Sequence, residues 1–333
     1  KANIMDFEVQ SVIGRGKHAK VVLCKHNKTG RAYAIKVLLK SKKDPNAEIL
    51  TENSMIESLI LRQMAHPFIV TLYSAFQGKE RLYLVMEYVS GGELYFHVSQ
   101  YGRFEESRAH FYAAEIVLAL EYLHAKNIVF CDLKLENIML SRTGHVKLTD
   151  FGMARQLDAT GRWYIDRNCT LEYMAPEVLL GAPFHFTSDW WSFGIVLFEM
   201  ISGYHPFYCE DRERICELIT TGVVEYPETV SAPARDLMRG LFVRNAEKRL
   251  GRAGHAARHH AYFQGVDWDA VLNLRPPPFV PELTNECDIR FFDEQFTSEP
   301  VNDWTPVRPS MLMSPTEAES RFTNFSYNAH PLV

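Results

Sequence analysis

The stretch that decides the fold spans residues 128–177 and carries three polar motifs: IVFCDLKLEN (128–137), VKLTDFG (146–152) and TLEYMAPE (170–177). The first motif supplies a carboxylate (Asp132), an ammonium (Lys134) and a carboxamide (Asn137), and the second supplies another carboxylate (Asp150). Side-chain oxygens are the ligands that Mg²⁺ prefers, and a carboxylate beside a cation suits transfer of a phosphoryl group to a hydroxyl. The stretch therefore predicts a magnesium-dependent phosphoryl-transfer site.

Upstream of this stretch, strand-like segments surround a glycine-rich turn. Residues 7–37 are rich in alternating and β-branched side chains and are interrupted at Gly14 and Gly16, which predicts strands joined by tight turns. Glycines at such a turn let backbone amides approach phosphate oxygens. The turn alone is typical of an ordinary hairpin, but the spacing to Lys36 favours a phosphate-binding role for both. The basic run 40–43 is interpreted as solvated.

The composition is that of an ordinary globular protein. The 333 residues are 47% hydrophobic and 23% charged, and the net charge of -5 gives no reason to expect nucleic acid or an anionic membrane as partner. Six scattered cysteines without a C-x-x-C pair predict free thiols. No apolar run reaches the length of a membrane span. We expect a cytoplasmic monomer without membrane contact of its own. The sequence does not begin with methionine, so we expect a missing upstream domain that would give access to the membrane or nucleus.

The order of the predicted elements indicates an α+β protein with two lobes. A small lobe of five antiparallel strands and one helix (residues 49–64) ends at a hinge near Gly91, and a larger lobe is mainly helical. The segment 188–202 is apolar nearly all round, which predicts a buried helix. From about residue 266, short aromatic and proline-containing pieces predict a tail that wraps the domain.

Together, these motifs resemble those of protein kinases. The tail pieces PPF, FDEQFT, Thr305-Pro306 and FTNFSY (322–327) narrow the resemblance to AGC serine/threonine kinases, in the branch of protein kinase B, protein kinase C and the serum- and glucocorticoid-regulated kinase, with protein kinase B as the first choice. The resemblance covers the whole chain. It implies the bilobal protein-kinase fold, with a catalytic domain at 7–263 (small lobe 7–88, large lobe 89–263) and a regulatory tail at 264–333.

The resemblance implies a role for each matching residue of the catalytic stretch. Asp132 would accept or orient the proton of the acceptor hydroxyl, and Lys134 would neutralise charge on the moving phosphate. Thr170 would bond both of them. Asn137 and Asp150 would hold Mg²⁺.

The resemblance also implies ATP as the cofactor. Lys36, braced by Glu52 on the 49–64 helix, would position the α and β phosphates. The remaining ATP contacts would come from the glycine turn, the strands and the hinge: Gly14, Gly16, Val21, Ala34, Met86, Glu87, Val89, Glu93 and Met139.

Three carboxylates match positions that select arginines before the phosphoacceptor in this family: Glu93, Glu136 and Glu199. Each alone is typical of a surface acid. Carboxylates bind guanidinium groups bidentately, so the three predict protein substrates with a basic Arg-x-Arg-x-x-Ser/Thr motif.

The departures from the family concern how the enzyme is switched on. The usual His-Arg-Asp is Phe-Cys-Asp at 130–132, the usual activation-loop phosphothreonine falls at Asp166, and a helix histidine falls at Glu48. Of the phosphate-binding groups only Arg155 is kept. A phosphate dianion needs several cationic donors, so we predict that phosphorylation at this position has been abandoned.

The tail carries two expected phosphorylation sites for upstream kinases, Thr305 and Ser326. Phosphate on Ser326 would fix Phe322 and Phe325 in a groove of the small lobe, with Gln77 placed to hold it.

Three further expectations concern internal contacts and an alternative function. Arg249 is predicted to pair with Glu177, and Asp189 to cap its helix or bond the catalytic loop. The alternative function is a pseudokinase or nucleotide-binding scaffold, which Ala19, in place of a third glycine, and Cys131 would favour.

Overall fold

The computed structural model describes residues 3–16, 19–40, 45–78, 80–158, 170–252, 257–301, 322 and 324–329, and for 45–51 the backbone only. The chain divides into two compact units. The first comprises Lys1–Ala65, Val70–Gly92 and Glu282–Val333, and the second comprises His66–Ile69 and Glu93–Pro281. An antiparallel sheet in the first unit and mainly helices in the second confirm the predicted α+β class.

The first unit is built on an antiparallel sheet that has six strands among the described residues, in the order β1-β2-β3-β5-β4-β10. The strands are β1 (Phe7–Arg15), β2 (Ala19–His26), β3 (Ala32–Leu39), β4 (Leu72–Gln77), β5 (Arg81–Glu87) and β10 (Tyr327–Asn328). The sequence predicted five. The sixth, β10, comes from the tail and pairs with Ala75 and Ser74 of β4. A strand of two residues carries no periodicity, so the pattern could not reveal it.

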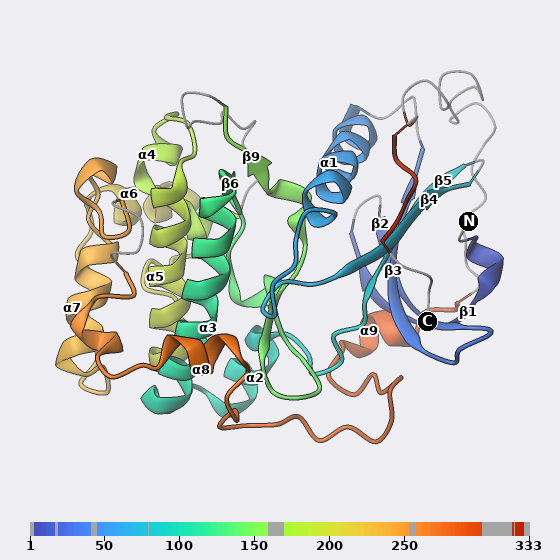
Figure 1. Cartoon of the computed structure of the whole chain (residues 1–333). Helices are drawn as coiled ribbons and strands as arrows, with labels where there is room; N and C mark the ends of the chain where they lie inside the picture. The colour runs from blue at the N-terminus through green and yellow to red at the C-terminus, as the bar shows by residue number, and fades with distance from the viewer. Residues whose placement is uncertain are drawn as a thin grey trace. The chain divides into compact units, whose positions relative to one another are not determined.

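Two α-helices and a 3₁₀ turn, Ile4–Asp6, complete the described part of this unit. α1 (Pro45–Leu61) packs beside β3 and β4 (Figure 1), and it begins earlier than predicted because proline is well tolerated in the first helical turn. α9 (Glu294–Thr297), from the tail, packs against β1. Phe296 of α9 extends the apolar cluster beneath the sheet, which includes Val12, Val22 and Val85.

The described helices of the second unit are α2 (Leu94–Tyr101), α3 (Glu106–Ala125), α4 (Pro176–Leu179), α5 (Phe186–Ser202), α6 (Arg212–Thr221), α7 (Ala232–Leu241) and α8 (Trp268–Leu272). α3 and α5 lie side by side in its core (Figure 1). As predicted, α5 is buried on every face, with Trp190, Phe193 and Leu197 almost inaccessible. No described helix is long and apolar enough to cross a membrane.

Two short antiparallel ladders in the second unit position the catalytic stretch. β6 (Ile128–Val129) pairs with β9 (Arg155–Gln156), and β7 (Ile138–Leu140) pairs with β8 (Val146–Leu148). Asn137 directly precedes β7, and Thr149 directly follows β8, so the antiparallel pairing brings them together. The Thr149 amide donates to the Asn137 carbonyl over 2.9 Å. Asp150 is thereby held near the loop that carries Asp132.

The cysteines that the structure describes are all free, in agreement with the prediction: Cys24, Cys131, Cys209, Cys216 and Cys287.

Candidate active site

Four polar side chains of the second unit form one hydrogen-bonded network around Asp132. Its Oδ1 accepts from the Thr170 hydroxyl over 3.0 Å, and its Oδ2 accepts from Asn137 Nδ2 over 2.9 Å. Lys134 Nζ lies 2.9 Å from the same Oδ2 and donates to Thr170 Oγ1 over 2.8 Å. The carboxylate is therefore fixed in one orientation with an ammonium beside it.

The environment of Lys134 keeps its side chain charged. Burial lowers the pKa of this amine, but the carboxylates of Asp132, Glu136 and Asp150 raise it by more, so that the pKa lies above its ordinary value. At neutral pH the network therefore retains a cation that can face a phosphate.

Asn137, which belongs to this network, and Asp150 have side-chain oxygens that fit a magnesium ion. Asn137 Nδ2 also donates to the Asp132 carbonyl over 2.8 Å, and among the described residues no group donates to Asn137 Oδ1. Asp150 is exposed, in a left-handed conformation (φ 55°) at the start of a 3₁₀ turn, where its Oδ1 accepts from the Gly152 amide over 3.4 Å. An amide oxygen and an exposed carboxylate form a hard donor set, which suits Mg²⁺.

Asp189 of α5 supports the loop that contains Phe130, Cys131 and Asp132. Its carboxylate accepts from the Phe130 and Cys131 amides, each over 2.9 Å, and lies 2.8 Å from His124 Nε2. Cys131 has a left-handed conformation (φ 68°), which is unfavourable for a residue with a Cβ and needs such support. Of the two predicted roles of Asp189, the structure shows the loop contact, because His185 caps α5.

In the first unit, Lys36 of β3 pairs with a glutamate of α1, but the predicted partner was wrong. Lys36 Nζ lies 2.8 Å from Oε2 and 3.1 Å from Oε1 of Glu57, whose side chain is only 1% exposed. Glu52 is exposed. The two glutamates are separated by five positions, which turns them about 140° apart around a helix, so they occupy different faces.

The predicted contacts to the nucleotide in the first unit lie on neighbouring strands. Gly14 of β1 is opposite Val21 of β2, and Ala34 of β3 is opposite Met86 of β5. Gly16 directly follows β1. Val21 and Ala34 belong to one apolar cluster, so these side chains share a face of the sheet.

The remaining predicted nucleotide contacts are divided between the two units. In the first, the Glu87 amide donates to the Thr71 carbonyl over 2.9 Å, and Val89 is buried. In the second, Met139 of β7 is half-buried and forms an isolated β-bridge with Glu93, which is also half-buried.

Glu199 is buried and Glu136 is half-buried in the second unit, and the charge of Glu136 acts on Glu199. The Tyr173 hydroxyl donates to Glu199 Oε2 over 2.7 Å. Burial above all, and the charge of Glu136, raise the pKa of Glu199 to about 8, and burial also raises the pKa of Glu136. Glu136 Oε2 is buried with no hydrogen-bond partner among the described residues. The pair thus has an unmet capacity for a cationic donor.

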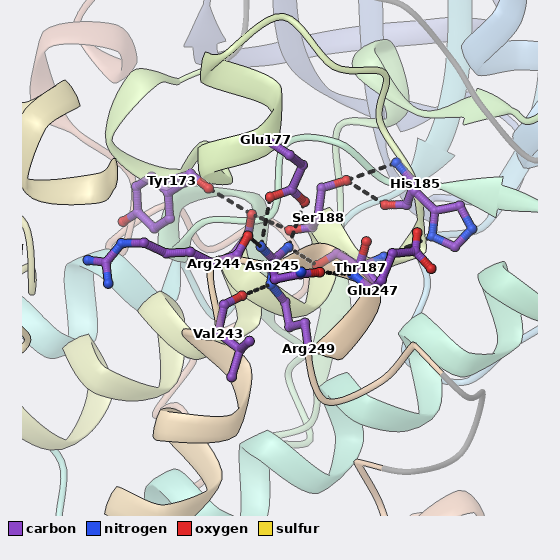
Figure 2. A network of polar contacts seen from close by, with 11 residues as sticks. Tyr173, Glu177, His185, Thr187, Ser188, Val243, Arg244, Asn245, Glu247 and Arg249 are labelled. Carbon is purple, nitrogen blue, oxygen red and sulfur yellow. Dashed lines mark hydrogen bonds and ion pairs between the residues drawn. The ribbon is translucent and has the colours of Figure 1, made fainter. Parts of the chain in front are cut away.

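The predicted ion pair between Arg249 and Glu177 is confirmed (Figure 2). Two parallel hydrogen bonds, of 2.6 and 2.7 Å, join the guanidinium to the carboxylate. Arg249 is 2% exposed and also donates to the carbonyls of Val243 and Thr187, each over 2.9 Å. This bidentate, buried pair fastens the end of the catalytic stretch to the helical core.

An apolar cluster surrounds Cys131, at the position where the family has the phosphate-binding arginine. Cys131 is 7% exposed and packs with Val129, Leu157 and Phe184. The side chains described in this cluster are apolar, so none of them can pair with a phosphate.

The basic position that the chain retains is used within its own loop. Arg155 is buried, and its Nη1 donates to the carbonyls of Gly152 and Ala154, each over 2.8 Å. Asp166, Thr305 and the side chain of Glu48 lie outside the described residues.

The aromatic residues of the tail are seated in the first unit. Phe322 and Phe325 are both 0% exposed. Gln77 Nε2 donates to the Phe322 carbonyl over 3.1 Å, and Lys40 Nζ donates to Gln77 Oε1 over 2.8 Å and lies 5.3 Å from the Phe322 ring. Lys40 is 3% exposed, so its interpretation as a solvated lysine was wrong.

A second tail contact that the sequence did not reveal is made by Arg62, just after α1. Its guanidinium donates to the carbonyls of Asn324 (2.9 Å) and Phe325, and lies over the Tyr327 ring at 4.9 Å. Ser326, between these contacts, is exposed. The sequence placed Arg62 in the last turn of a predicted helix but could not show this contact, because its partners are 262 and 263 positions away.

Comparison with known proteins shows the family to which the chain belongs. The protein kinase domain family matches residues 7–263. Over 99% of its length the chain is 41% identical to RAC-beta serine/threonine-protein kinase A of Xenopus laevis, of which it covers 68%. It is 40% identical over the same share to RAC-beta serine/threonine-protein kinase of Homo sapiens, of which it covers 69%. These comparisons give no support to a pseudokinase or scaffold. The chain therefore belongs to the protein kinase family, as a serine/threonine kinase of the AGC branch.

Proposed function

We propose that this kinase transfers the γ-phosphate of ATP to serine or threonine in protein segments of the form Arg-x-Arg-x-x-Ser/Thr. The observation that carries the proposal is the network of Asp132, Lys134, Asn137 and Thr170, because it combines a fixed acceptor of a hydroxyl proton with a charged donor for the moving phosphate.

In the proposed reaction, Asp132 orients the acceptor hydroxyl and takes its proton as the oxygen attacks the γ-phosphorus. Lys134 donates to the phosphate oxygens. Asn137 and Asp150 would hold Mg²⁺, which when bound neutralises charge on the phosphates. Lys36 is held by Glu57 and would orient the phosphates, as an ammonium fixed by a buried carboxylate can do.

The nucleotide would be held mainly by apolar contacts and backbone groups. Val21, Ala34 and Met139 would pack on the base, beside Met86. The backbone of Glu87 and Val89 would bond its edge, Glu93 would border the site, and the turn at Gly14 and Gly16 would cover the phosphates. In this assignment residues 7–263 form the catalytic domain and 264–333 its regulatory tail.

Substrate selection is assigned to Glu93, Glu136 and Glu199. Two carboxylates with raised pKa values favour a ligand that brings positive charge, and a guanidinium also satisfies Glu136 Oε2, which has no partner among the described residues. Arginine upstream of the acceptor supplies that group.

Regulation is assigned to the tail. The apolar cluster around Cys131 supports activity without a phosphate in the activation loop, with Asp166 as a single-charge substitute. Upstream kinases would act on Thr305 and Ser326, and the exposed side chain of Ser326 is accessible to them. We place the kinase in the cytoplasm, as a monomer.

A pair of peptides tests the substrate proposal. We expect kcat/KM for an Arg-x-Arg-x-x-Ser peptide to exceed that for the same peptide with alanine at both arginines by at least about 100-fold, since each charge-assisted pair contributes roughly 1.5–3 kcal/mol and two pairs are lost. Replacement of Glu136 by glutamine should shrink the ratio. Equal phosphorylation of the two peptides would show that arginine is not selected.

A further inference from the structure

Tyr173, whose hydroxyl binds Glu199, also contacts the turn that follows α5. Glu199 lies in the last turn of this helix, which ends at Gly203 in a left-handed conformation (φ 81°). The Gly203 amide donates to the Glu199 carbonyl over 2.8 Å. Two residues later, the imidazole of His205 meets the Tyr173 ring, with 5.2 Å between the ring centroids and an interplanar angle of 80°. The tyrosine thus has Glu199 at its hydroxyl and His205 at its ring.

The backbone at position 203 accepts only glycine. A Cβ there would lie 1.8 Å from the Gly102 carbonyl oxygen, and the left-handed conformation is unfavourable for other residues. The direction in which the chain leaves α5, and with it the place of His205, is therefore fixed by the sequence.

His205 is itself held in place and stays uncharged. Its Nδ1 accepts from the Phe207 amide over 3.1 Å, so the proton of the neutral ring is on Nε2. Phe207 is 1% exposed and stacks on Trp191 of α5, with ring centroids 5.5 Å apart. Burial lowers the pKa of His205 to about 4, against a smaller opposite effect of the Glu172 backbone. The ring is therefore a fixed, neutral partner for Tyr173 at physiological pH.

The neutral imidazole leaves Glu199 in need of a cation. An imidazolium beside Tyr173 would bring positive charge toward this carboxyl, and a substrate guanidinium would then gain less by binding it. Within the part of the chain that the structure describes, the Glu199 carboxyl accepts from the Tyr173 hydroxyl alone, over 2.7 Å. Burial and the charge of Glu136 raise the pKa of Glu199, whereas this hydrogen bond lowers it. The Tyr173 ring therefore affects both the position of Glu199 and its ionised fraction.

The contact with His205 gives the Tyr173 ring a preferred orientation. Two aromatic rings at a large angle attract each other, because the positive edge of one meets the negative face of the other. Ser192 Oγ donates to the Tyr173 carbonyl over 2.9 Å, which fixes the backbone and not the ring. Removal of the imidazole therefore weakens the restraint on the tyrosine hydroxyl.

We propose that His205 is a positioning residue for the recognition of a substrate arginine, because it holds the Tyr173 hydroxyl on Glu199. The inference rests on the proposed selection of arginine by Glu199. His205 acts through Tyr173, so its loss should affect the KM of arginine peptides and not the transfer of the phosphate.

Steady-state kinetics with the arginine peptide and its alanine counterpart tests this inference on the whole chain. His205→Gln lacks the ring but can still accept from the Phe207 amide. It should raise the KM of the arginine peptide on the order of three- to tenfold, and leave kcat and the KM of the alanine peptide unchanged. His205→Phe keeps a ring and should retain most of the selection. His259→Gln, at an exposed position of the same unit, is the control and should change nothing.

The pH profile gives a readout that a purely structural role would not move. In the wild type, the KM of the arginine peptide should fall as the pH rises through about 8, where Glu199 ionises. A weaker hydrogen bond from Tyr173 raises the pKa of Glu199 further, so in His205→Gln the fall should occur at a higher pH.

The other outcomes contradict the inference. If His205→Gln keeps the wild-type KM values, or loses activity on both peptides in parallel with an unmoved pH profile, the ring does not position Glu199. If His205→Phe is as impaired as His205→Gln, the aromatic contact is not what matters. If the wild type phosphorylates both peptides equally, the proposed selection of arginine fails, and the inference with it.

Discussion

At the scale of single residues, the face of α1 on which a glutamate lies decides whether it pairs with Lys36. Glu57 is buried against the ammonium, whereas Glu52 is exposed. We predict that Glu57→Gln lowers kcat/KM by about 100-fold, because a misplaced phosphate-binding group costs that much in comparable sites. The matched control Glu52→Gln should stay within about twofold of the wild type. Steady-state kinetics with a basic peptide distinguishes the two, and similar losses in both variants would contradict the assignment.

The raised pKa of Glu199 predicts a pH dependence of substrate binding. Only the ionised carboxylate binds a guanidinium well, and with a pKa of about 8 Glu199 is mostly protonated at pH 6.5 in the free enzyme. The KM for an arginine peptide should therefore fall as the pH rises through 8, on the order of tenfold between pH 6.5 and 8.5.

The control for this prediction is a peptide with alanine in place of the arginines, whose KM should depend less on pH. Glu199→Gln should flatten the profile of the arginine peptide as well. An unchanged ratio of the two KM values across this pH range would show that Glu199 does not bind the arginine.

Residues in contiguous motifs could be predicted from the sequence, and residues with distant partners could not. Asp132, Lys134 and Asn137 lie within six positions, so spacing alone brings them together. The sequence indicated Lys36, but the prediction of its partner was wrong, because the sequence does not show which glutamate of the helix faces the sheet. Lys40 and Arg62 contact the tail, and the sequence gives no register for that contact.

At the scale of elements, the tail is attached through a strand and an arginine. β10 extends the sheet at β4, where the Ser74 hydroxyl donates to the Tyr327 carbonyl over 2.9 Å, and Arg62 binds the carbonyls just before it. A hydrogen bond to a charged group contributes roughly 1.5–3 kcal/mol, so the arginine is a large part of this attachment.

Arg62→Ala should therefore release β10. We predict faster amide hydrogen exchange of residues 324–329 by about tenfold or more, which corresponds to a loss of at least about 1.4 kcal/mol, together with lower activity. Gln63→Ala, at the exposed neighbouring position, is the matched control and should leave both properties unchanged. Unaltered exchange in Arg62→Ala would mean that the strand pairing alone holds the tail.

The elements differ in how well the sequence predicts them. α3 and α5 follow from long apolar patterns, and the strands of the first unit follow from their alternation and turns. β10 and α9 are too short to show a period, and their existence depends on the sheet against which they pack.

At the scale of the whole molecule, we propose that apolar packing around Cys131 replaces the phosphate contact that the resemblance to the family implies. We predict that Cys131→Arg, which restores the family residue, does not restore dependence on loop phosphorylation. It should instead lower the unfolding free energy by about 3 kcal/mol or more, because an unpaired guanidinium would be buried among Val129, Leu157 and Phe184.

Cys131→Ala is the control and should cost about 1 kcal/mol, since it removes a single buried sulfur. Thermal unfolding of both variants gives the comparison. A Cys131→Arg protein as stable as the wild type, and more active after loop phosphorylation, would show that the phosphate-binding site persists.

We propose that the catalytic network is complete without activation-loop phosphorylation. The most direct measurement is transfer of labelled phosphate from Mg-ATP to an Arg-x-Arg-x-x-Ser peptide by the unphosphorylated chain, beside an Asp132→Asn variant. We predict turnover that requires Mg²⁺ and falls by at least about 100-fold in Asp132→Asn. Binding of Mg-ATP without phosphate transfer, or equal transfer by the two proteins, would contradict the account.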